Sequence, residues 1–474
     1  MKVRRSIGMA CLAGVLAILP VSEASALFLD KEVVRATVQE TETDTWDGEL
    51  HVLLKTSNYS GVYHSSVTVT ATKAFTISNG KKTKKYKAKK RVTLRSGNSM
   101  FKNGASVQVD TKDGGKIKVT SIKRSQGVPA YRGSLTIKAV SGKGLAVIND
   151  VDMDSYLYSV VESEMSSSFA PEALKAQAVT ARSFAYDCRN SSTYASVGAD
   201  FDDSTSYQVY NNKKESATVR SAVDATSDMV VKADGNVLRT YFFSTSFGKT
   251  GLPSEIWGGT ATDNYFNSVI QVYNSEDFSL DTDEKFHAFL EETKDTGIEK
   301  NNEWYRWSVD TNARNLSKQI NNKLGACYLL YPAQVQVQQK DGSFKGQIIH
   351  SLGTIEEVSV EKRANSGMVE EILLKGTSAT VKVSNVTAIR MLLAPYYDKL
   401  VKQNGTQSTG LSYLPSNFFE ITKNDDTTFS IAGGGYGHGI GMSQNGANQL
   451  AKDGYTYDNI LKHYYKNVEI EEIE

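Results

Sequence analysis

Cysteine and proline are scarce in this chain of 474 residues, which has three cysteines and seven prolines. So few cysteines exclude a disulfide framework, and so few prolines, without a long biased tract, argue against a disordered or mucin-like chain. A dominant charge is also missing. The formal net charge is only +1, which excludes the strong positive field of a nucleic-acid-binding protein. The 40% hydrophobic content is that of a globular protein with a core.

Motifs for metals and cofactors are missing as well. The six histidines are scattered and none lies in an HExxH pattern, so the sequence predicts no metal site. The longest glycine-rich stretch lacks both the GxGxxG spacing and the lysine of a phosphate-binding loop, and we expect no cofactor. Cys188 and Cys327, which follow the N-terminal segment, are compatible with two buried thiols or with one bridge.

The N-terminus has the three parts of a secretory signal. Positive charges in Met1-Lys-Val-Arg-Arg5 are followed by an apolar run from Ile7 to Val21 and by small residues that end at Ala26. We predict cleavage after Ala26, and therefore a protein that is secreted or held in the cell envelope outside the cytoplasmic membrane. The apolar run is shorter than the roughly 20 residues of a membrane span and contains Pro20, which favours a removed signal over an N-terminal anchor.

Short runs of alternating β-branched residues follow the signal, separated by turn signals at Ser78-Asn-Gly80 and Asp113-Gly-Gly115. They predict a β-rich region over residues 27–130. The strand candidates are Leu50–Leu54, Ser66–Thr70, Ser106–Asp110 and Lys116–Thr120. A lysine-rich stretch from Lys81 to Arg91 fits either contact with anionic wall polymers or a solvated edge hairpin. The hairpin is favoured, because lysines discourage pairing between sheet edges.

One predicted helix covers residues 171–188, with proline at its first position and Glu172 in its first turn. Small residues recur along it at helical spacing, so other elements can approach closely and we expect it to be central. Further strands are predicted at residues 229–231, 237–243 and 354–383, and helices at 444–453 and 457–465. The sequence thus predicts an α+β fold: a β-rich N-terminal region, then a mixed catalytic domain over residues 131–474 with a central helix and a helical insertion or lid near 274–347.

Two carboxylates, Glu162 and Glu164, stand just ahead of the central helix. We expect an extended segment there, so that a carboxylate lies at the positive end of the helix dipole. Burial would raise its pKa and the dipole would lower it, which makes a tunable acid. The alternative is that either carboxylate only caps helix amides.

A glycine-rich block from Gly433 to Ala447 surrounds His438. Glycines on both sides of the imidazole remove side-chain walls, so the backbone can approach a bulky, extended ligand closely. Ser443 is not a nucleophile elbow, because its context is GMSQNG and not GxSxG. The alternative is a glycine-rich turn with a structural histidine.

Four blocks resemble the stage II sporulation protein D family, which includes amidase enhancers. They cover most of the chain from Tyr131 to Ile470, in order. The blocks are Tyr131-Arg-Gly-Ser-Leu135 with Val151–Val161; Ser163-Glu-Met165 with Glu172–Arg182; Gln208-Val-Tyr210, Tyr241–Ser246 and Ile256-Trp-Gly258; and Gly435–Ala447 with Ile460–Tyr465.

The resemblance implies a peptidoglycan lytic transglycosylase that leaves anhydro-muramyl ends, in sporulation or cell-wall remodelling. It implies Glu164 as the catalytic acid and Arg182 as the residue that orients this acid or grips the glycan. Tyr436, His438 and Gln444 match the glycine-rich block and are candidates for lining the cleft. The alternative is a non-enzymatic enhancer that binds peptidoglycan and stimulates a cell-wall amidase. The presence of Glu164 and Arg182 favours the enzyme.

The chain departs from the family pattern at two places. Ser166 replaces the usual proline after Ser-Glu-Met, which loosens the turn after Glu164. Some relatives offer cysteine or histidine as zinc ligands after their Ser-Thr-Ser block, where this chain has Phe247 and Lys249. This difference is a second reason to expect no metal.

Overall fold

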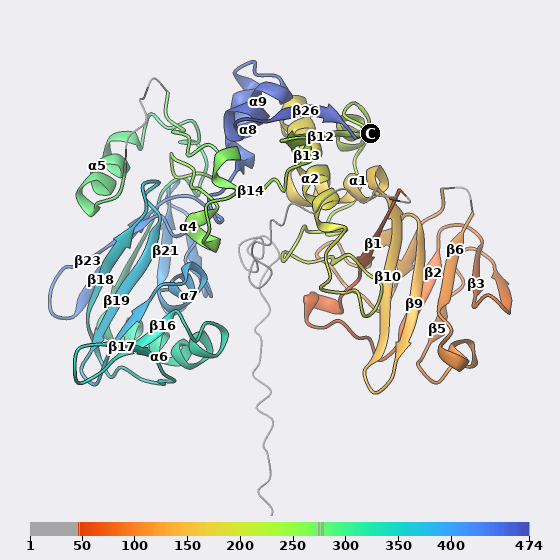
Figure 1. Ribbon diagram of the computed structural model, residues 1–474, viewed down its shortest axis with the longest axis horizontal. Helices are drawn as coiled ribbons and strands as arrows, with labels where there is room; N and C mark the ends of the chain where they lie inside the picture. The colour runs from red at the N-terminus through yellow and green to blue at the C-terminus, as the bar shows by residue number, and fades with distance from the viewer. Residues whose placement is uncertain (1–45, 47, 113, 274, 276–278, 474) are drawn as a thin grey trace, which may run out of the picture.

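The computed structural model describes residues 46, 48–112, 114–273, 275 and 279–473. Figure 1 shows two lobes side by side, joined at one end by a layer of helices. The predicted signal sequence, residues 1–26, lies outside the described residues. Within the described part of the chain, no helix combines the length and apolar character needed to cross a membrane.

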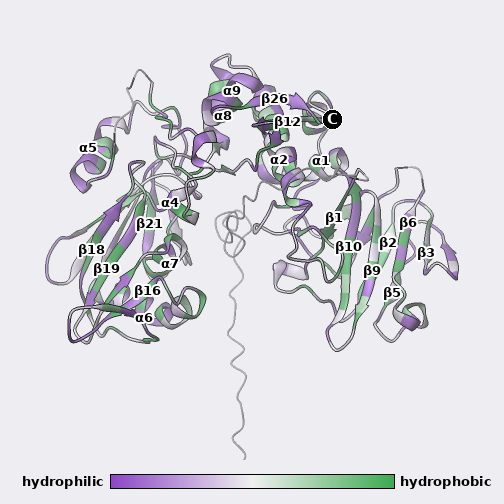
Figure 2. Cartoon of the chain, viewed as in Figure 1, coloured by the Kyte–Doolittle hydropathy of each residue, from purple (hydrophilic) through white to green (hydrophobic). Residues whose placement is uncertain are grey.

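The first lobe is built on a seven-stranded sheet whose third strand, β10 (Gly144–Asp152), is buried on both faces. Leu145 and Val147 face the main core, whereas Ala146 and Ile148 face a smaller apolar cluster. Figure 2 shows that hydrophobic and hydrophilic residues alternate along other strands in both lobes. In spatial order the strands are β11 (Phe201–Asp202), β1 (Glu49–Leu53), β10 (Gly144–Asp152), β9 (Ser134–Val140), β6 (Val107–Thr111), β3 (Phe75–Ser78) and β4 (Thr83–Tyr86).

A four-stranded sheet shares the main core of this lobe. Its order is β5 (Val92–Leu94), β2 (Val67–Ala71), β7 (Ile117–Val119) and β8 (Ala130–Tyr131). The four strands predicted before residue 121 are confirmed as β1, β2, β6 and β7. The turn predicted between β6 and β7 does not close a hairpin, because β6 pairs with β3 and β9 while β7 pairs with β2 and β8. The lysine-rich stretch includes β4, at the sheet edge, where Lys84 and Lys85 are exposed, as expected for an edge hairpin.

The predicted central helix is confirmed as α2 (Pro171–Cys188). Ala178, Ala181 and Ala185 are buried, so neighbouring elements approach its axis closely. Figure 1 shows it within the helical layer. The elements packed on it are α1 (Met153–Glu164), α3 (Ala217–Asp224), α8 (Gln444–Lys452), α9 (Tyr457–Tyr464), β12 (Met229–Ala233) and β13 (Asn236–Val237). Strand β12 also pairs with β26 (Glu469–Glu472) near the C-terminus.

The second lobe has its own hydrophobic core, from Trp307 to Ile431. One five-stranded sheet has the order β22 (Gln407–Thr409), β21 (Lys399–Lys402), β15 (Trp307–Asn312), β24 (Thr428–Gly433) and β23 (Phe419–Lys423). The other has the order β17 (Phe344–Gly346), β16 (Val335–Gln338), β20 (Thr380–Val383), β19 (Val369–Gly376) and β18 (Ile355–Arg363). The helices that join this core are α6 (Ala313–Leu330) and α7 (Val386–Leu392), whereas α4 (Ser254–Trp257) and α5 (Asp283–Thr293) pack against the main core.

Two predicted boundaries need revision. Strands β1 and β6, from the region 27–130, pair with β10 and β9, so no structural boundary falls at residue 131. The insertion predicted near 274–347 contains α5, which packs in the main core, and α6, which belongs to a lobe that continues to β24. Short-range patterns could not reveal either point, because both depend on pairing between distant strands.

The two cysteines of the described region lie in different cores. Cys188 is buried in α2, within the core of the first lobe, and Cys327 is buried in α6, within the core of the second. Neither forms a disulfide bond. Of the two alternatives, two buried thiols or one bridge, the structure has two buried thiols.

Candidate active site

Glu164 is the last residue of α1, which corrects the extended segment predicted from the sequence. The helix begins because the Asp152 side chain accepts the Ser155 amide at its N-cap (2.8 Å). Tyr156 and Val160, four residues apart, are both buried and hold one face of the helix in the core. Glu164 therefore lies at the C-terminal, negative end of α1, and not at the positive end of α2.

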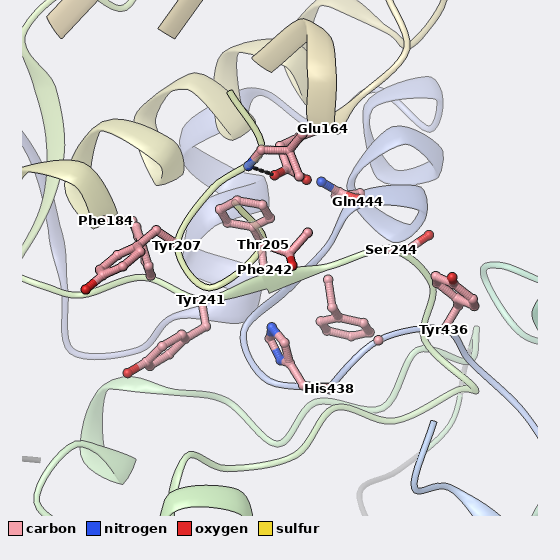
Figure 3. Close-up of a pocket in the computed structure, with 13 residues that line it drawn as sticks. Glu164, Phe184, Thr205, Tyr207, Tyr241, Phe242, Ser244, Tyr436, His438 and Gln444 are labelled. Carbon is pink, nitrogen blue, oxygen red and sulfur yellow. Dashed lines mark hydrogen bonds between the residues drawn. The ribbon is translucent and has the colours of Figure 1, made fainter. Parts of the chain in front are cut away.

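The Glu164 carboxylate is bound by a backbone amide. Its Oε1 accepts a hydrogen bond from the Val209 nitrogen at 2.8 Å, the bond drawn in Figure 3. Across the site, the Gln444 amide points at the same carboxylate (Figure 3). Gln444 Nε2 is buried and does not meet hydrogen-bond geometry with a protein partner.

The loop that presents Val209 is held from several sides. The Gln208 side chain donates to a carbonyl of α2 (3.1 Å), and the Tyr210 hydroxyl donates to Asn149 on β10 (2.8 Å). Ser163, next to Glu164, accepts the backbone amide of Asn212 (3.0 Å). The Gln208-Val-Tyr210 block thus positions the hydrogen-bond donor to Glu164, a role that the sequence did not reveal.

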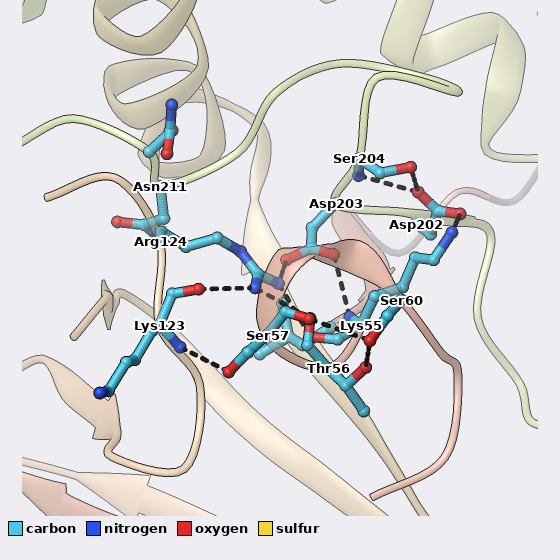
Figure 4. A network of polar contacts seen from close by, with 12 residues as sticks. Lys55, Thr56, Ser57, Ser60, Lys123, Arg124, Asp202, Asp203, Ser204 and Asn211 are labelled. Carbon is cyan, nitrogen blue, oxygen red and sulfur yellow. Dashed lines mark hydrogen bonds and ion pairs between the residues drawn. The ribbon is translucent and has the colours of Figure 1, made fainter. Parts of the chain in front are cut away.

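A buried ion pair anchors the start of this loop to the N-terminal strands. Arg124 and Asp203 are joined at 2.5 Å, with both side chains 0% exposed. Arg124 also donates to the Lys55 and Thr56 carbonyls (2.8 and 3.1 Å) and stacks on Tyr59. Asp203 also accepts the Lys55 amide (2.9 Å). Figure 4 shows this network, which connects the segment after β1 with the segment that leads to Val209.

Burial raises the pKa of Glu164 to about 7. The Val209 hydrogen bond, the Gln444 side chain and the Lys213 charge oppose this rise. Its place at the C-terminus of α1 acts in the same direction as burial, because the helix dipole disfavours negative charge there. Near neutral pH the group is therefore present both as an acid and as a carboxylate.

The glycine-rich block forms the opposite wall of a pocket at Glu164. Strands β14 (Phe242–Phe243) and β25 (Met442–Ser443) pair in parallel, which places the block beside residues 241–246. Gly437 has a φ of 117°, and a Cβ there would lie 2.8 Å from the Phe243 side chain, so glycine is required. The residues that line the pocket are Glu164, Phe184, Thr205, Tyr207, Val209, Tyr241, Phe242, Phe243, Ser244, Tyr436, Gly437, His438 and Gln444.

Tyr436, His438 and Gln444, three of the predicted cleft residues, thus share one pocket with Glu164. Aromatic rings continue the wall on either side of His438. The His438 ring centroid lies 6.3 Å from that of Tyr241 and 5.7 Å from that of Phe243. Figure 3 shows Tyr241, His438 and Tyr436 along one side of the pocket, facing Glu164. Such a wall suits a ligand with apolar faces and polar edges.

The His438 ring is fixed by backbone groups. Its Nδ1 accepts the Ile440 amide at 3.1 Å. Burial and the Arg390 charge lower its pKa to about 4, and a hydrogen bond to the Phe242 backbone opposes this shift only in part. The imidazole is therefore neutral at physiological pH, and it serves as a wall of the pocket and not as a proton donor.

Arg182 does not reach Glu164, which corrects the role expected from the resemblance. The side chain is 1% exposed, and it donates to Asp154 (2.9 Å) and to the Met229 carbonyl (3.0 Å). Asp154 and Glu164 are ten residues apart on α1, or roughly 15 Å along the helix axis. Arg182 joins α2 to the start of α1 and to β12, and it is not among the pocket residues.

Phe247, where some relatives have a zinc ligand, is fully buried. Its ring stacks on Phe418 of the second lobe, with centroids 4.4 Å apart. Lys249 is also buried. Among the described residues no group of three or more His, Cys, Asp or Glu side chains could hold a metal ion. Metal independence stays a prediction.

Two family models match this chain. Residues 141–233, which carry α1, α2 and the Val209 loop, match the model described as stage II sporulation protein. Residues 253–441, which include the second lobe, match a domain of unknown function (DUF8618). The stage II sporulation protein D of Bacillus subtilis (strain 168) is 27% identical over 365 residues, 73% of this chain and 83% of that protein. These matches support the resemblance of the chain to the stage II sporulation protein D and amidase-enhancer family.

Two further relatives agree with this resemblance. The stage II sporulation protein D of Bacillus amyloliquefaciens is 25% identical over 339 residues, 69% of this chain and 76% of that protein. The amidase enhancer of Bacillus subtilis (strain 168) is 25% identical over 313 residues, 65% of this chain. The match spans only 39% of the amidase enhancer, so that protein is much longer than the part it shares with this chain.

Proposed function

We propose that this chain is a lytic transglycosylase that cuts peptidoglycan glycan strands, with Glu164 as the catalytic acid. The observation that carries the proposal is a single carboxyl group with a pKa of about 7 in a pocket walled by aromatic rings. Among the described residues that line this pocket, Glu164 is the only acid. A hydrolase of the usual type needs two carboxyl groups across the scissile bond.

One carboxyl group is sufficient for lytic transglycosylation. Protonated Glu164 donates its proton to the glycosidic oxygen as the bond from that oxygen to the muramyl C1 breaks. The resulting carboxylate then accepts the proton of the sugar's own 6-hydroxyl while O6 bonds to C1, which gives the 1,6-anhydro end without water. The pKa of Glu164 suits both steps, because the group gives and takes a proton near neutral pH.

Mass spectrometry of the products from purified protein and peptide-free glycan strands tests the proposal. Anhydro-muramyl ends are expected from the wild type, and reducing ends or intact glycan would contradict it. Similarity to stage II sporulation proteins supports a role in sporulation or cell-wall remodelling.

A second candidate is a non-enzymatic enhancer that binds peptidoglycan and stimulates a cell-wall amidase, favoured by the name of one relative. The two candidates separate in one experiment, in which an amidase digests cell walls with wild-type protein or with Glu164→Gln. A pure enhancer stimulates equally well with either protein, because its role needs no proton transfer.

Export and metal independence complete the proposal. N-terminal sequencing of the mature protein should give a start at or near Leu27, and an intact Met1 in a membrane fraction would contradict signal removal. Treatment with a chelator should leave folding and activity unchanged. Stoichiometric zinc in the purified protein would overturn this expectation.

A further inference from the structure

The second lobe contacts the wall of the Glu164 pocket directly. The Gly435 amide donates to the Trp304 carbonyl (2.8 Å), and the Trp307 indole nitrogen donates to the Gly435 carbonyl (3.1 Å). The next residue, Tyr436, exchanges backbone hydrogen bonds with Thr245 on the other side (2.8 and 3.1 Å). The segment that carries the pocket residue Tyr436 is therefore fixed between the second lobe and the pocket strands.

Trp304 packs on this wall at Tyr436. Its ring packs on that of Tyr436, with centroids 4.6 Å apart and planes tilted by 42°. Trp304 is partly exposed, whereas the neighbouring Tyr305 and Trp307 are buried in the protein. Lys402 Nζ lies 4.2 Å from the Trp304 ring centroid and pairs with Glu303 at 2.9 Å.

This combination suits a carbohydrate. A pyranose ring presents C–H groups on its faces and hydroxyl or acetamido groups around its edge, so it packs against an aromatic ring while polar groups nearby bind the edge. Trp304 is an aromatic residue that stays partly exposed, and Lys402 and Glu303 place charged hydrogen-bonding groups beside it. Backbone hydrogen bonds anchor both residues: the Gln403 amide donates to the Glu303 carbonyl (3.0 Å), and the Lys402 amide donates to the Thr406 carbonyl (2.9 Å).

We propose that the second lobe supplies a sugar-binding wall to the Glu164 pocket, in which Trp304 contacts a sugar of the glycan beyond those held at Glu164. This inference rests on the proposed function, and it gives the lobe a role in holding the substrate. A longer glycan should therefore gain affinity from Trp304 as well as from the pocket.

Titration calorimetry with peptide-free glycan fragments of four or more disaccharide units tests this inference. The measurements use Glu164→Gln as the parent, so that binding is separated from cleavage. Adding Trp304→Ala should weaken binding about tenfold, and Trp304→Phe, which keeps a ring against Tyr436, should weaken it less. Tyr396→Ala removes an aromatic ring that is 40% exposed elsewhere on the second lobe, and it should leave affinity unchanged. Thermal melting checks that each variant is folded. If Trp304→Ala does not fold, the affinity of Trp304→Phe is the measurement that tests the inference.

A double-mutant comparison separates contact from support of Tyr436. If Trp304 touches the sugar, Trp304→Ala still weakens binding when Tyr436 is already alanine. No further loss in that background, or an unchanged affinity of the Trp304 variants, overturns the inference. Absence of any binding by the Glu164→Gln parent contradicts the proposed function itself, and the inference then falls with it.

Discussion

The Glu164 carboxylate and the Val209 amide, 45 residues apart in the chain, are joined by a hydrogen bond of 2.8 Å. This bond favours the charged carboxylate, whereas burial of the group favours the neutral acid. Burial dominates, which leaves the pKa of Glu164 at about 7. Any change in this pair should therefore alter both the proton-transfer chemistry and its pH dependence.

Replacing Glu164 by Gln should lower kcat by about 100- to 10,000-fold, because the side chain keeps its size but loses the transferable proton. Binding of glycan should be largely retained. At pH 8 the variant should melt at the same temperature as the wild type or higher, because no charge remains in the buried position. Wild-type rates of anhydro-end formation by this variant would refute the assignment of Glu164.

Glu162→Gln is the matched control. Glu162 lies two residues before Glu164 on the helix, so its side chain points roughly 200° around the helix axis from that of Glu164. Glu162 is 7% exposed and does not line the pocket. The variant should keep its activity. If neither variant makes anhydro ends, the two carboxylates must be treated as one coupled site.

Activity should fall as the pH rises through about 7, because only protonated Glu164 can donate to the glycosidic oxygen. The neutral acid also contributes stability. Its folded pKa is above the usual 4.5, so this contribution is complete below about pH 4.5 and is lost as the pH rises through about 7. His438, with a pKa of about 4, should not affect the profile above pH 5. Initial rates and melting temperatures from pH 5 to 9 measure both effects, and rates that rise through pH 7 would exclude Glu164 as the acid.

Sequence patterns predicted the candidate site residues better than the residues that surround them. The helix α2 was predictable because its proline, its first-turn glutamate and its small residues are local signals. Glu164, Tyr436, His438 and Gln444 were found through motif blocks, and the structure brings them to one pocket. Their neighbours were not predictable, because the pocket is assembled by the parallel pairing of β14 with β25 and by the Val209 loop, which join segments far apart in the chain.

The main corrections to the sequence predictions also have physical causes. The segment before Glu164 was predicted as extended, although Asp152 caps a helix there and Tyr156 with Val160 gives it a buried face. Arg182 matched a family motif, but a motif does not show which side of a helix faces the substrate. The size of the second lobe was missed because its sheets pair strands from residue 307 to residue 433.

Arg182→Met should destabilise the fold without a specific effect on glycan binding. The change leaves Asp154 and the Met229 carbonyl without their partner, and it should cost about 2 kcal/mol in the free energy of unfolding. The folded fraction should bind glycan as the wild type does. Denaturant unfolding and calorimetry at a temperature where the variant is folded measure the two quantities. Normal stability together with lost glycan binding would restore the substrate-contacting role that the resemblance implied.

Arg124→Met should damage the site from a distance, through the loop that holds Val209. The change leaves Asp203 buried without its cation, and both side chains are 0% exposed, so the free energy of unfolding should fall by about 3–5 kcal/mol. A loosened loop weakens the Val209 hydrogen bond, which normally lowers the pKa of Glu164, so this pKa should rise and the alkaline fall in activity should move to higher pH. Lys375→Met breaks the exposed pair with Glu357 on the second lobe and should change neither quantity measurably.

If Arg124→Met does not fold, Arg124→Lys keeps the charge with fewer hydrogen bonds and should show a smaller shift in the same direction. An unchanged melting temperature and an unchanged pH profile in both Arg124 variants would mean that the N-terminal strands do not support the site.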